Sequence, residues 1–261
     1  MLAIERRNAI LAKLSVEGKV VVSDLSREFD VTEETIRRDL EKLDQEGLAK
    51  KTYGGAIKNE NFNIDIPFHV RQQANVEQKQ YIASIIAEMI HDGDYIMLDS
   101  STTALFVIKN ILNRHKITLI TNSIKILIEL CNKPDWTVIS TGGTLKEGGL
   151  SLVGYQAEKM VAGYHVDLAI CSCKGLDTGM GVTDSNERDS EIKKAFFASA
   201  KKKVLAIDST KFDKASFVKV CNIDDVDMIV TDKDPGENWK NTALKLGVEL
   251  KFSANEESKE D

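Results

Sequence analysis

Short apolar runs alternate with helical stretches along most of the chain from residue 94 onward. Seven runs have the length and composition of strands, at 95–99, 117–121, 137–141, 167–172, 203–208, 228–232 and 248–252. Helical stretches at 103–112, 124–131, 154–161, 187–200 and 238–246 separate most of them. Strands that alternate with helices in this way are typical of a mainly parallel sheet covered on both faces. The sequence therefore predicts an α/β fold for this region.

The first 57 residues space their apolar side chains differently. Three short helices are expected, the first ending near Gly18, the second capped by Ser23 and the third running from a Thr32 cap to Gly47. A brief extended segment at 20–22 separates the first two. The stretch 48–57 is too short for another helix, and its glycine pair suits a turn or a wing. Two helices joined by a tight turn and followed by a hairpin match a winged helix-turn-helix.

These two patterns divide the chain. The expected parts are a winged helix-turn-helix DNA-binding domain at 1–57, a linker at 58–74, an α/β effector-binding domain at 75–252 and a tail at 253–261. The larger domain is expected to open with a helix from near Val76 to His91. The tail is acidic and is expected to be disordered.

The charge of the chain is not that of a protein with a general nucleic-acid-binding surface, which would be basic. The formal net charge is −6, and residues 1–57 hold ten Lys and Arg against eleven Asp and Glu. Any contact with DNA must therefore come from the local placement of a few cations. Acids on the far side of the domain are then expected to limit non-specific binding.

Several classes of protein are excluded by what the sequence lacks. No run approaches the roughly 18 uninterrupted apolar residues that a membrane helix needs. Charges interrupt the apolar positions of the first 14 residues, unlike the apolar core of a secretory signal. We therefore expect a cytoplasmic protein without a membrane partner.

Neither a metal site nor a catalytic site is expected. The four cysteines are Cys131, Cys171, Cys173 and Cys221, and the close pair is separated by one residue, too few for a CxxC motif. Core packing is the better reading of that pair, and the histidines at 69, 91, 115 and 165 form no ligand motif. Candidate acids and bases are Asp99, Asp177, Asp184, Glu187 and Asp208. No motif pairs any of them with a partner, and no GxSxG or Walker sequence is present.

Polar residues follow five of the predicted strands. They include Asp99 to Thr103, Asn122, the Gly142–Gly143 pair, Lys174 to Asp177, and Asp208 to Lys211. In an open α/β sheet, ligands bind beyond the carboxyl ends of the strands. Each segment alone could equally be ordinary helix capping. Together they favour one pocket for a polyhydroxylated anion, with phosphate held by lysines and helix N-termini.

The third helix has a polar face that could read DNA. On a helical wheel, Ile36, Leu40 and Leu43 lie on the core side, whereas Arg38 and Lys42 lie opposite. The alternative is a solvated helix with Glu34–Arg38 and Arg37–Glu41 ion pairs. A basic hairpin, Lys50-Lys51-Thr52-Tyr53, follows and could reach phosphates or the minor groove. The helix-turn-helix context favours the DNA-binding reading.

Residues 6–40 resemble the signature of the DeoR family of bacterial transcription regulators. The matching residues are Arg6, Ile10 and Leu14 in the first helix, and Thr32 and Thr35-Ile-Arg-Arg-Asp-Leu40 in the recognition helix. The KTYGGA segment at 51–56 resembles the family's wing, with Tyr53 where histidine is common. The predicted DNA-binding residues are Thr32, Thr35, Arg37, Arg38, Lys42, Lys50, Lys51 and Tyr53. Thr35 and Arg38 are expected at base edges, and the other cations at phosphates.

The resemblance extends over about 75–252 to the family's sensor domain, which is similar in fold to ribose-5-phosphate isomerase. It implies that this domain binds phosphorylated sugars without converting them. The predicted effector-binding residues are Asp99, Ser100, Ser101, Thr102, Thr103, Asn122, Gly142, Gly143, Lys174, Asp177, Thr183, Lys193 and Lys211. Cys171-Ser-Cys-Lys174 departs from the small, glycine-containing stretch common in the family. Lys174 either adds a cation to the pocket or occupies a variable position.

These observations predict a repressor of a sugar or carbohydrate catabolic operon. It would bind double-stranded operator DNA as a homodimer or homotetramer and be released by a phosphorylated sugar acting as allosteric effector. One alternative is a sugar-phosphate isomerase or deaminase with a DNA-binding appendage. Another is an adaptor whose winged helix binds a protein.

Overall fold

The chain divides into two compact units, an N-terminal unit at Met1–Val76 and a C-terminal unit at Glu77–Asp261. A computed structural model describes residues 1–59, 66–146 and 148–253. Of the acidic tail expected to be disordered at 253–261, residues 254–261 lie outside the described residues.

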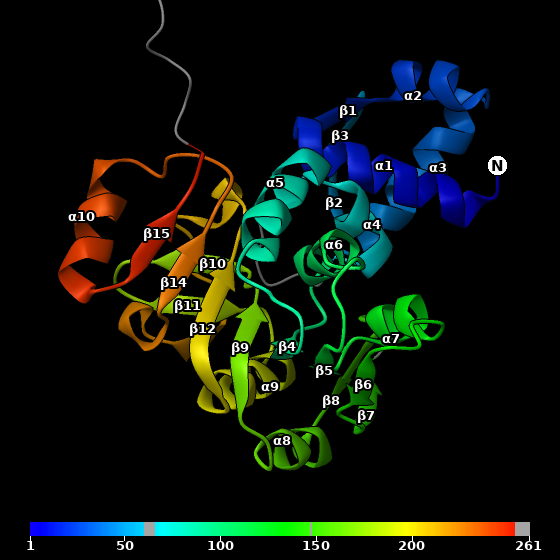
Figure 1. Cartoon of the computed structure of the whole chain (residues 1–261). Coiled ribbons are helices and arrows are strands. Elements are labelled where there is room, and N and C mark those ends of the chain that lie inside the picture. The colour runs from blue at the N-terminus through cyan, green and yellow to red at the C-terminus, as the bar shows by residue number, and fades with distance from the viewer. Residues whose placement is uncertain (60–65, 147, 254–261) are drawn as a thin grey trace, which may run out of the picture. The chain divides into compact units, whose positions relative to one another are not determined.

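The N-terminal unit has the helices and the hairpin of a winged helix-turn-helix. Its elements are α1 (Ala3–Glu17), β1 (Lys19–Val21), α2 (Val22–Phe29), α3 (Glu33–Gln45), β2 (Ala49–Thr52) and β3 (Gly55–Lys58), coloured blue to cyan-blue in Figure 1. The three strands form an antiparallel sheet in the order β1-β3-β2. Gly18 ends α1 in the left-handed conformation, as its position predicts, because it carries no Cβ.

One helix start in this unit was predicted wrongly. Helix α2 begins at Val22 with Val21 at the N-cap, so Ser23 lies inside the helix and does not cap it. The first backbone N–H groups of a helix lack intrahelical partners. Here the Val22 N–H donates to the Gly54 carbonyl in the wing turn, 2.9 Å away, and this tertiary bond takes the place of a side-chain cap.

Apolar side chains from α1, α2 and α3 form most of the core of the N-terminal unit. They include Ile10, Leu14, Leu25, Ile36, Leu40 and Leu43, each at most 2 % exposed. The turn between α2 and α3 is tight because Asp30 adopts a positive φ of 50°. The Ser26 hydroxyl donates to the Val31 carbonyl across it, 2.6 Å away. The core fixes which face of α3 remains outside.

Part of the expected linker is a helix. Residues 68–73 form α4 (Phe68–Gln73), which packs against α1, and Val70 joins the core of the N-terminal unit. The surrounding sequence is polar, and the two buried apolar side chains of α4 are too few to produce a visible period. The linker prediction is therefore wrong for these residues.

A seven-stranded parallel sheet is the centre of the C-terminal unit. Its strands are β4 (Tyr95–Leu98), β5 (Thr118–Thr121), β6 (Thr137–Ser140), β9 (Val166–Cys171), β12 (Ala200–Ala206), β14 (Met228–Val230) and β15 (Glu249–Lys251). They are ordered β15-β14-β12-β9-β4-β5-β6, and each neighbouring pair is parallel. All seven predicted strands are thus confirmed, together with the α/β fold class.

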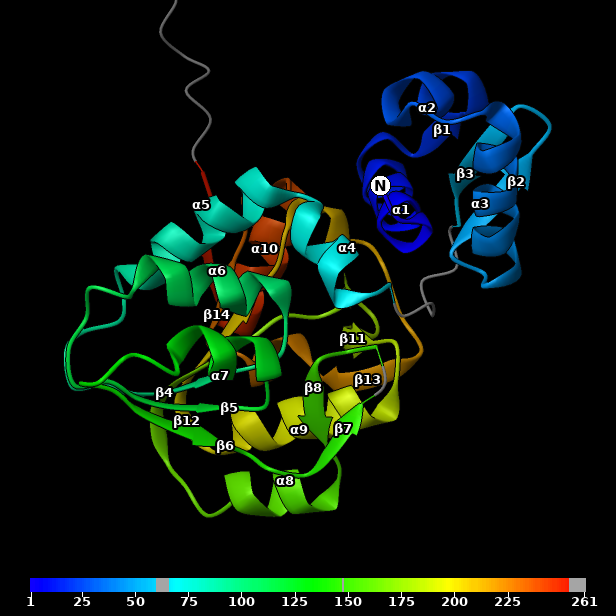
Figure 2. The ribbon, with the colours of Figure 1, turned by 90° about the vertical axis from the view of Figure 1, so that its right-hand side faces the viewer.

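Helices cover both faces of this sheet. They are α5 (Val76–Ala87), α6 (Thr102–Asn110), α7 (Ile124–Leu130), α8 (Tyr155–Val161), α9 (Glu187–Ala198) and α10 (Glu237–Leu246). Figure 2 shows α5, α6 and α7 on one side and α8 and α9 on the other. Because both faces are covered, strand residues such as Met97, Ala169 and Leu205 are completely buried.

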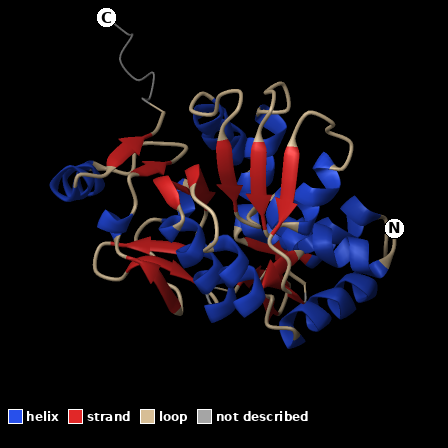
Figure 3. Ribbon diagram, turned by 60° about the horizontal axis from the view of Figure 1, so that its bottom comes forward, coloured by secondary structure: helices blue, strands red, loops and turns tan. Residues whose placement is uncertain are grey.

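Five shorter strands escaped the sequence pattern. A hairpin is formed by β7 (Thr144–Lys146) and β8 (Ser151–Val153), and a small antiparallel sheet by β10 (Gly175–Asp177), β11 (Gly181–Asp184) and β13 (Val218–Cys221). Two 3-10 turns, η1 (Ser209–Lys211) and η2 (Ile223–Asp225), complete the described elements. Figure 3 distinguishes the strands, in red, from the helices. Runs of three or four residues are too short to establish an alternation.

Candidate nucleic-acid interface and effector site

Helix α3 presents its predicted DNA-binding residues on the outer face. Thr32 is the N-cap, and its Oγ1 accepts from the Thr35 N–H at 3.3 Å, as expected. The two threonine hydroxyls also lie 2.9 Å apart. Arg37, Arg38 and Lys42 are exposed because the apolar residues of the same helix face the core. The predicted division of the helix into two faces is confirmed.

Each exposed cation of α3 has an acidic partner. Arg37 pairs with Glu33 at 2.8 Å, Arg38 with Glu34 at 3.4 Å and Lys42 with Glu46 at 3.7 Å. Of the two ion pairs named by the solvated-helix alternative, Glu34–Arg38 is present. The Arg37–Glu41 pair is not found among the described residues, because Arg37 extends toward the N-terminus of the helix, the direction in which helical side chains point.

The wing follows α3 directly. In the hairpin of β2 and β3, Lys50 and Lys51 are exposed and Tyr53 stands fully in solvent at the turn. The Lys51 N–H donates to Asp44 Oδ1 at 2.9 Å, which ties the hairpin to the end of α3. The wing thus places two cations and an aromatic ring next to the recognition helix.

A buried ion pair behind α3 was missed. Arg6 Nε of α1 lies 2.5 Å from Asp39 Oδ2 of α3, and Arg7 Nη1 lies 3.7 Å from the other oxygen of the same carboxylate. Asp39 is 4 % exposed. A signal for it existed in the sequence, because Asp39 lies on the core side of the wheel, where an acid needs a partner.

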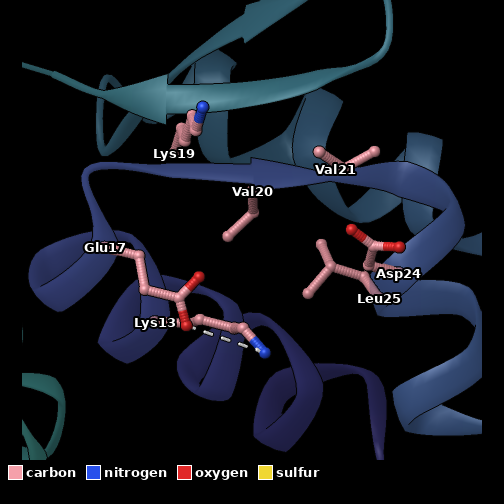
Figure 4. Close-up of a pocket in the computed structure, with 7 residues that line it drawn as sticks. All are labelled: Lys13, Glu17, Lys19, Val20, Val21, Asp24 and Leu25. Atoms are coloured by element: carbon pink, nitrogen blue, oxygen red, sulfur yellow. Dashed lines mark ion pairs between the residues drawn. The ribbon is translucent and has the colours of Figure 1, made fainter.

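An open pocket also lies in the N-terminal unit, between the end of α1, β1 and the start of α2 (Figure 4). It is lined by Lys13, Glu17, Lys19, Val20, Val21, Asp24 and Leu25. Lys13 is paired there with Glu17 at 3.8 Å and also with Glu28. None of the residues predicted to bind DNA or effector lines this pocket.

In the C-terminal unit, Asp99 holds two strand ends together. It follows β4, is 1 % exposed, and its Oδ1 accepts from the Ser101 N–H at 3.0 Å. Its Oδ2 accepts from the Ser172 N–H, beyond the neighbouring strand β9, also at 3.0 Å. Ser101 in turn caps α6 by accepting from the Ala104 N–H at 3.0 Å. The polar segments after β4 and β9 therefore meet at the carboxyl edge of the sheet.

Lys193 joins this group from α9. Its Nζ donates to Asp184 Oδ2 of β11 and lies 3.6 Å from Asp99 Oδ2. Burial lowers the pKa of Lys193, but the negative charges of Asp184 and Asp99 outweigh it and raise the pKa above its ordinary value. Burial likewise raises the pKa of Asp184, and Lys193 opposes this strongly enough to leave it lowered. The ammonium group of Lys193 thus lies between the carboxylates of Asp99 and Asp184.

Asn122 and Gly143 connect the sheet edge to the β7–β8 hairpin. Asn122 follows β5, and its Nδ2 donates to the Leu152 carbonyl at 3.0 Å. Its Oδ1 is buried, and no described residue donates to it. Gly143 has a φ of +100°, and a Cβ there would stand 2.7 Å from the Val153 carbonyl oxygen. Gly143 thus allows the hairpin to close against its own start.

Two predicted effector residues hold the small sheet together. Asp177 Oδ1 accepts from the N–H groups of Gly179 and Met180, each at 2.8 Å, and so forms the turn between β10 and β11. Thr183 Oγ1 donates to the Gly175 carbonyl at 3.0 Å and accepts from the Ser216 N–H at 2.9 Å. These side chains have structural partners, in contrast to the free carbonyl oxygen of Asn122.

The segment after β12 adds further polar groups. Asp208 caps η1, and its Oδ1 accepts from the Thr210 N–H at 3.0 Å. Burial raises the pKa of Asp208, but the charge of Lys211 and the hydrogen bonds from Thr210 lower it by more, so the pKa lies below its ordinary value.

Two other predicted effector segments lie in the described part of the same unit. The Lys174 N–H donates to the Thr183 carbonyl at 3.0 Å. The side chains of Thr102 and Thr103 are buried at the start of α6.

The close pair of cysteines, Cys171 and Cys173, lies in the core. Cys171 and Cys173 are buried, and burial raises the pKa of Cys173 to about 12. Over the described residues, no group of three or more His, Cys, Asp and Glu side chains could hold a metal ion.

No described helix has the length and apolar character to cross a membrane.

Known protein families account for both units. The DeoR C terminal sensor domain matches residues 74–233, and the DeoR-like helix-turn-helix domain matches residues 6–62. The chain belongs to the DeoR family of transcriptional regulators. The predicted family and the presence of a DNA-binding domain are thereby confirmed.

Full-length relatives of this DeoR-family chain are regulators too. The uncharacterized HTH-type transcriptional regulator YulB of Bacillus subtilis is 41 % identical over 89 % of this chain and 90 % of its own length. GolR of Listeria innocua is 33 % identical over 89 % and 91 %. A putative aga operon transcriptional repressor of Escherichia coli O157:H7 is 30 % identical over 94 % and 92 %. The chain is accordingly a transcriptional regulator and not an enzyme.

Likeness to solved structures is much weaker. Ribose 5-phosphate isomerase A of Methanocaldococcus jannaschii is 16 % identical, and the match covers 53 % of this chain and 55 % of that one with a TM-score of 0.40. At this level the comparison supports no argument about the site.

Proposed function

We propose that this DeoR-family regulator represses an operon of sugar or carbohydrate catabolism and that a phosphorylated sugar releases it from operator DNA. Two relatives of this chain are named for sugar operons: the putative aga operon repressor and an L-fucose operon activator of Haemophilus influenzae, 29 % identical over 89 % of this chain and 93 % of its own length. The link of this chain to sugar catabolism is inferred from that kinship.

The outer face of α3 carries the DNA-binding part of the proposal. A helix capped by Thr32, with two arginines in its second turn and an apolar opposite face, can enter a major groove while its core side stays packed. Arg38 is assigned to base edges together with Thr35, and Arg37, Lys42, Lys50 and Lys51 to phosphates. One winged helix makes few contacts, so two or four copies would bind repeated half-sites.

The effector-binding part of the proposal rests on Asn122 Oδ1, which is buried and has no hydrogen-bond donor among the described residues. A buried acceptor without a donor costs free energy, about 1–3 kcal/mol, unless a ligand or water supplies one. A sugar hydroxyl is such a donor. The nine-residue helix α6, whose first turn holds the buried Thr102 and Thr103, offers backbone N–H groups to a phosphate at the same sheet edge. Lys211 adds a cation on η1.

The proposed role of Lys193 is more limited than that of a free cation. Its ammonium group already lies between two carboxylates, so its charge is balanced inside the protein. It would contact an effector while remaining paired with Asp99 and Asp184. Effector binding would then favour the conformation with lower DNA affinity.

Binding of the full-length protein to its own promoter DNA tests the first part. The variant Arg37→Ala/Arg38→Ala should weaken binding at least tenfold, and binding of the parent should weaken steeply as salt rises. Lys201→Ala/Lys202→Ala, in the C-terminal unit, removes the same charge and serves as the control. Binding that is indifferent to salt and to the arginines would contradict the assignment.

A thermal-shift screen with pentose and hexose phosphates tests the second part. A ligand that binds the native state raises the melting temperature, and the same compound should release promoter DNA. Replacing Asn122 with Asp, of nearly equal size, should abolish the shift, because a buried negative charge disfavours an anionic ligand. Turnover of any sugar phosphate by the purified protein would contradict a pure sensor.

A further inference from the structure

Among the described residues, four of the five cations proposed to contact DNA, all except Lys50, are paired with an acid of the same unit. The pairs are Arg37–Glu33, Arg38–Glu34, Lys42–Glu46 and Lys51–Glu41, the last at 3.9 Å. Three are between residues one helical turn apart on α3, and the fourth joins α3 to the wing. The acids therefore lie on the DNA-facing surface and not on the far side of the domain.

These pairs are exposed, unlike the Arg6–Asp39 pair behind them. The side chains of Arg38 and Glu34 are 79 % and 65 % exposed, whereas those of Arg6 and Asp39 are 8 % and 5 % exposed. An exposed ion pair is weak and opens readily. A phosphate can thus replace the carboxylate as partner of the cation, but the displaced carboxylate stays beside it.

We propose that Glu33, Glu34, Glu41 and Glu46 compete with DNA phosphates for the cations of the recognition helix and the wing, and so weaken binding to DNA that lacks the operator sequence. This inference rests on the proposed DNA-binding function. Backbone contacts supply nearly all of non-specific affinity, because they neutralise phosphates and release counterions. A cation that is already neutralised by a neighbouring acid releases fewer counterions.

Binding to the operator is weakened by the same competition, but contacts with the bases offset the loss of affinity. The acids therefore lower the baseline affinity for any duplex, and sequence recognition provides the remainder. This account also explains how a domain with ten cations and eleven acids among residues 1–57 can bind DNA selectively. The limit on non-specific binding is local, at the cations themselves.

A purely structural role of the same acids predicts the opposite result. Glu33 and Glu34 lie in the first turn of α3, where negative charge stabilises a helix. If that were their whole contribution, neutralising them would loosen α3 and weaken DNA binding. If they compete with phosphates, neutralising them strengthens it. The sign of the change separates the two roles.

The test compares Glu33→Gln/Glu34→Gln with the parent as full-length protein. The probe is a random-sequence duplex of about 25 base pairs, and binding is followed by fluorescence anisotropy over a range of salt concentrations. We expect binding about three- to tenfold tighter at low salt, and a steeper salt dependence, since two cations are freed. Gln keeps the size and the helix propensity of Glu.

The matched control is Glu191→Gln/Glu237→Gln in the C-terminal unit. These acids belong to partly exposed ion pairs with Lys194 and Lys240, so the control removes the same charge and a similar pair elsewhere. Its affinity for the duplex should stay within twofold of the parent. An equal gain in the control would assign the effect to net charge and overturn the proposal.

Failure of this inference can be told apart from failure of the proposed function. If the parent binds the duplex and Arg37→Ala/Arg38→Ala does not, DNA binding stands. Unchanged or weaker binding by Glu33→Gln/Glu34→Gln would then overturn the competition alone. If the parent fails to bind any duplex at low salt, the DNA-binding function itself is wrong, and the inference falls with it.

Discussion

Arg6 of α1 and Asp39 of α3 form a buried ion pair in which Arg6 Nε lies 2.5 Å from Asp39 Oδ2. Arg7 approaches the other carboxylate oxygen, so one acid of the recognition helix is held by two arginines of the first helix. Packing alone allows a helix to slide or rotate slightly over apolar neighbours. A charged contact of this kind gives α3 one preferred orientation.

Removing one partner of this pair should destabilise α3 strongly. Asp39→Ala leaves the buried guanidinium of Arg6 uncompensated, and losses of about 3–5 kcal/mol are typical of such changes. Hydrogen exchange of α3 peptides, measured by mass spectrometry on the full-length protein, should show protection falling by that amount. The double variant Arg6→Met/Asp39→Leu, which removes both charges, should recover most of it. Equal protection in Asp39→Ala and the parent would contradict this role.

The glycine pair of the wing provides a second prediction with a built-in control. A Cβ on Gly55 would stand 1.9 Å from the Val20 carbonyl oxygen, whereas a Cβ on Gly54 would meet nothing within 4 Å. Gly55→Ala should therefore separate β3 from β1 and destabilise the N-terminal unit by about 1–3 kcal/mol. Gly54→Ala should be tolerated. Limited proteolysis at the wing would show rapid cleavage of the first variant alone.

Much of the fold could be predicted because the sequence pattern is dictated by burial. The edge strand β15 includes Glu249 and Lys251. The inner strands β5, β4, β9 and β14 are covered on both faces and must be apolar, so these strands were visible in the sequence. The helix α4 was not, because it buries only Phe68 and Val70 in a polar stretch. The hairpin of β7 and β8 was hidden for a similar reason, since its three-residue strands show no period.

The site was predictable in position but not in its internal pairing. Polar residues at strand ends pointed to one sheet edge, and Asp99 and Ser101 do meet the segment after β9 there. That Asp184 takes the ammonium group of Lys193 could not be inferred, because the two residues come from different elements and their approach depends on tertiary packing. Likewise, the helical wheel places Asp39 on the core side of α3, but its partner Arg6 could not be predicted because it lies 33 residues away.

Protonation of Asp208 and Asp184 should destabilise the C-terminal unit at low pH. Both have a folded-state pKa below the ordinary value, so their ionised forms stabilise the fold above about pH 4. This stability is lost as pH falls through the lowered pKa values. Both tryptophans, Trp136 and Trp239, are buried in this unit, so their fluorescence reports its urea unfolding.

The test of that prediction compares Asp208→Asn with the parent across pH 7 to pH 2. The variant should be less stable at pH 7 because it lacks the charge that Lys211 stabilises. It should also lose less stability on acidification, since one of the depressed carboxyls is gone. Parallel curves for the two proteins would show that Asp208 does not contribute to the acid transition.

Thiol reactivity should divide the four cysteines into one that reacts and three that do not. Cys131 is exposed, whereas burial raises the pKa of Cys171 well above its ordinary value and the pKa of Cys173 to about 12. Burial also raises the pKa of Cys221 to about 12. At pH 8 a thiol of that pKa is ionised in roughly one molecule in ten thousand, and the thiolate is the reactive form.

Titration of the native protein with a disulfide reagent at pH 8 should therefore release one thiol equivalent per chain rapidly. Cys131→Ser should abolish this fast phase, and the remaining three thiols should appear only in denaturant, at the rate of unfolding. Addition of urea thus turns the same assay into a measure of the stability of the C-terminal unit, which holds all four cysteines. Two or more fast equivalents in the native parent would mean that Cys171, Cys173 or the half-buried Cys221 is reached by solvent, and the packing of the C-terminal unit would then be looser than its burial implies.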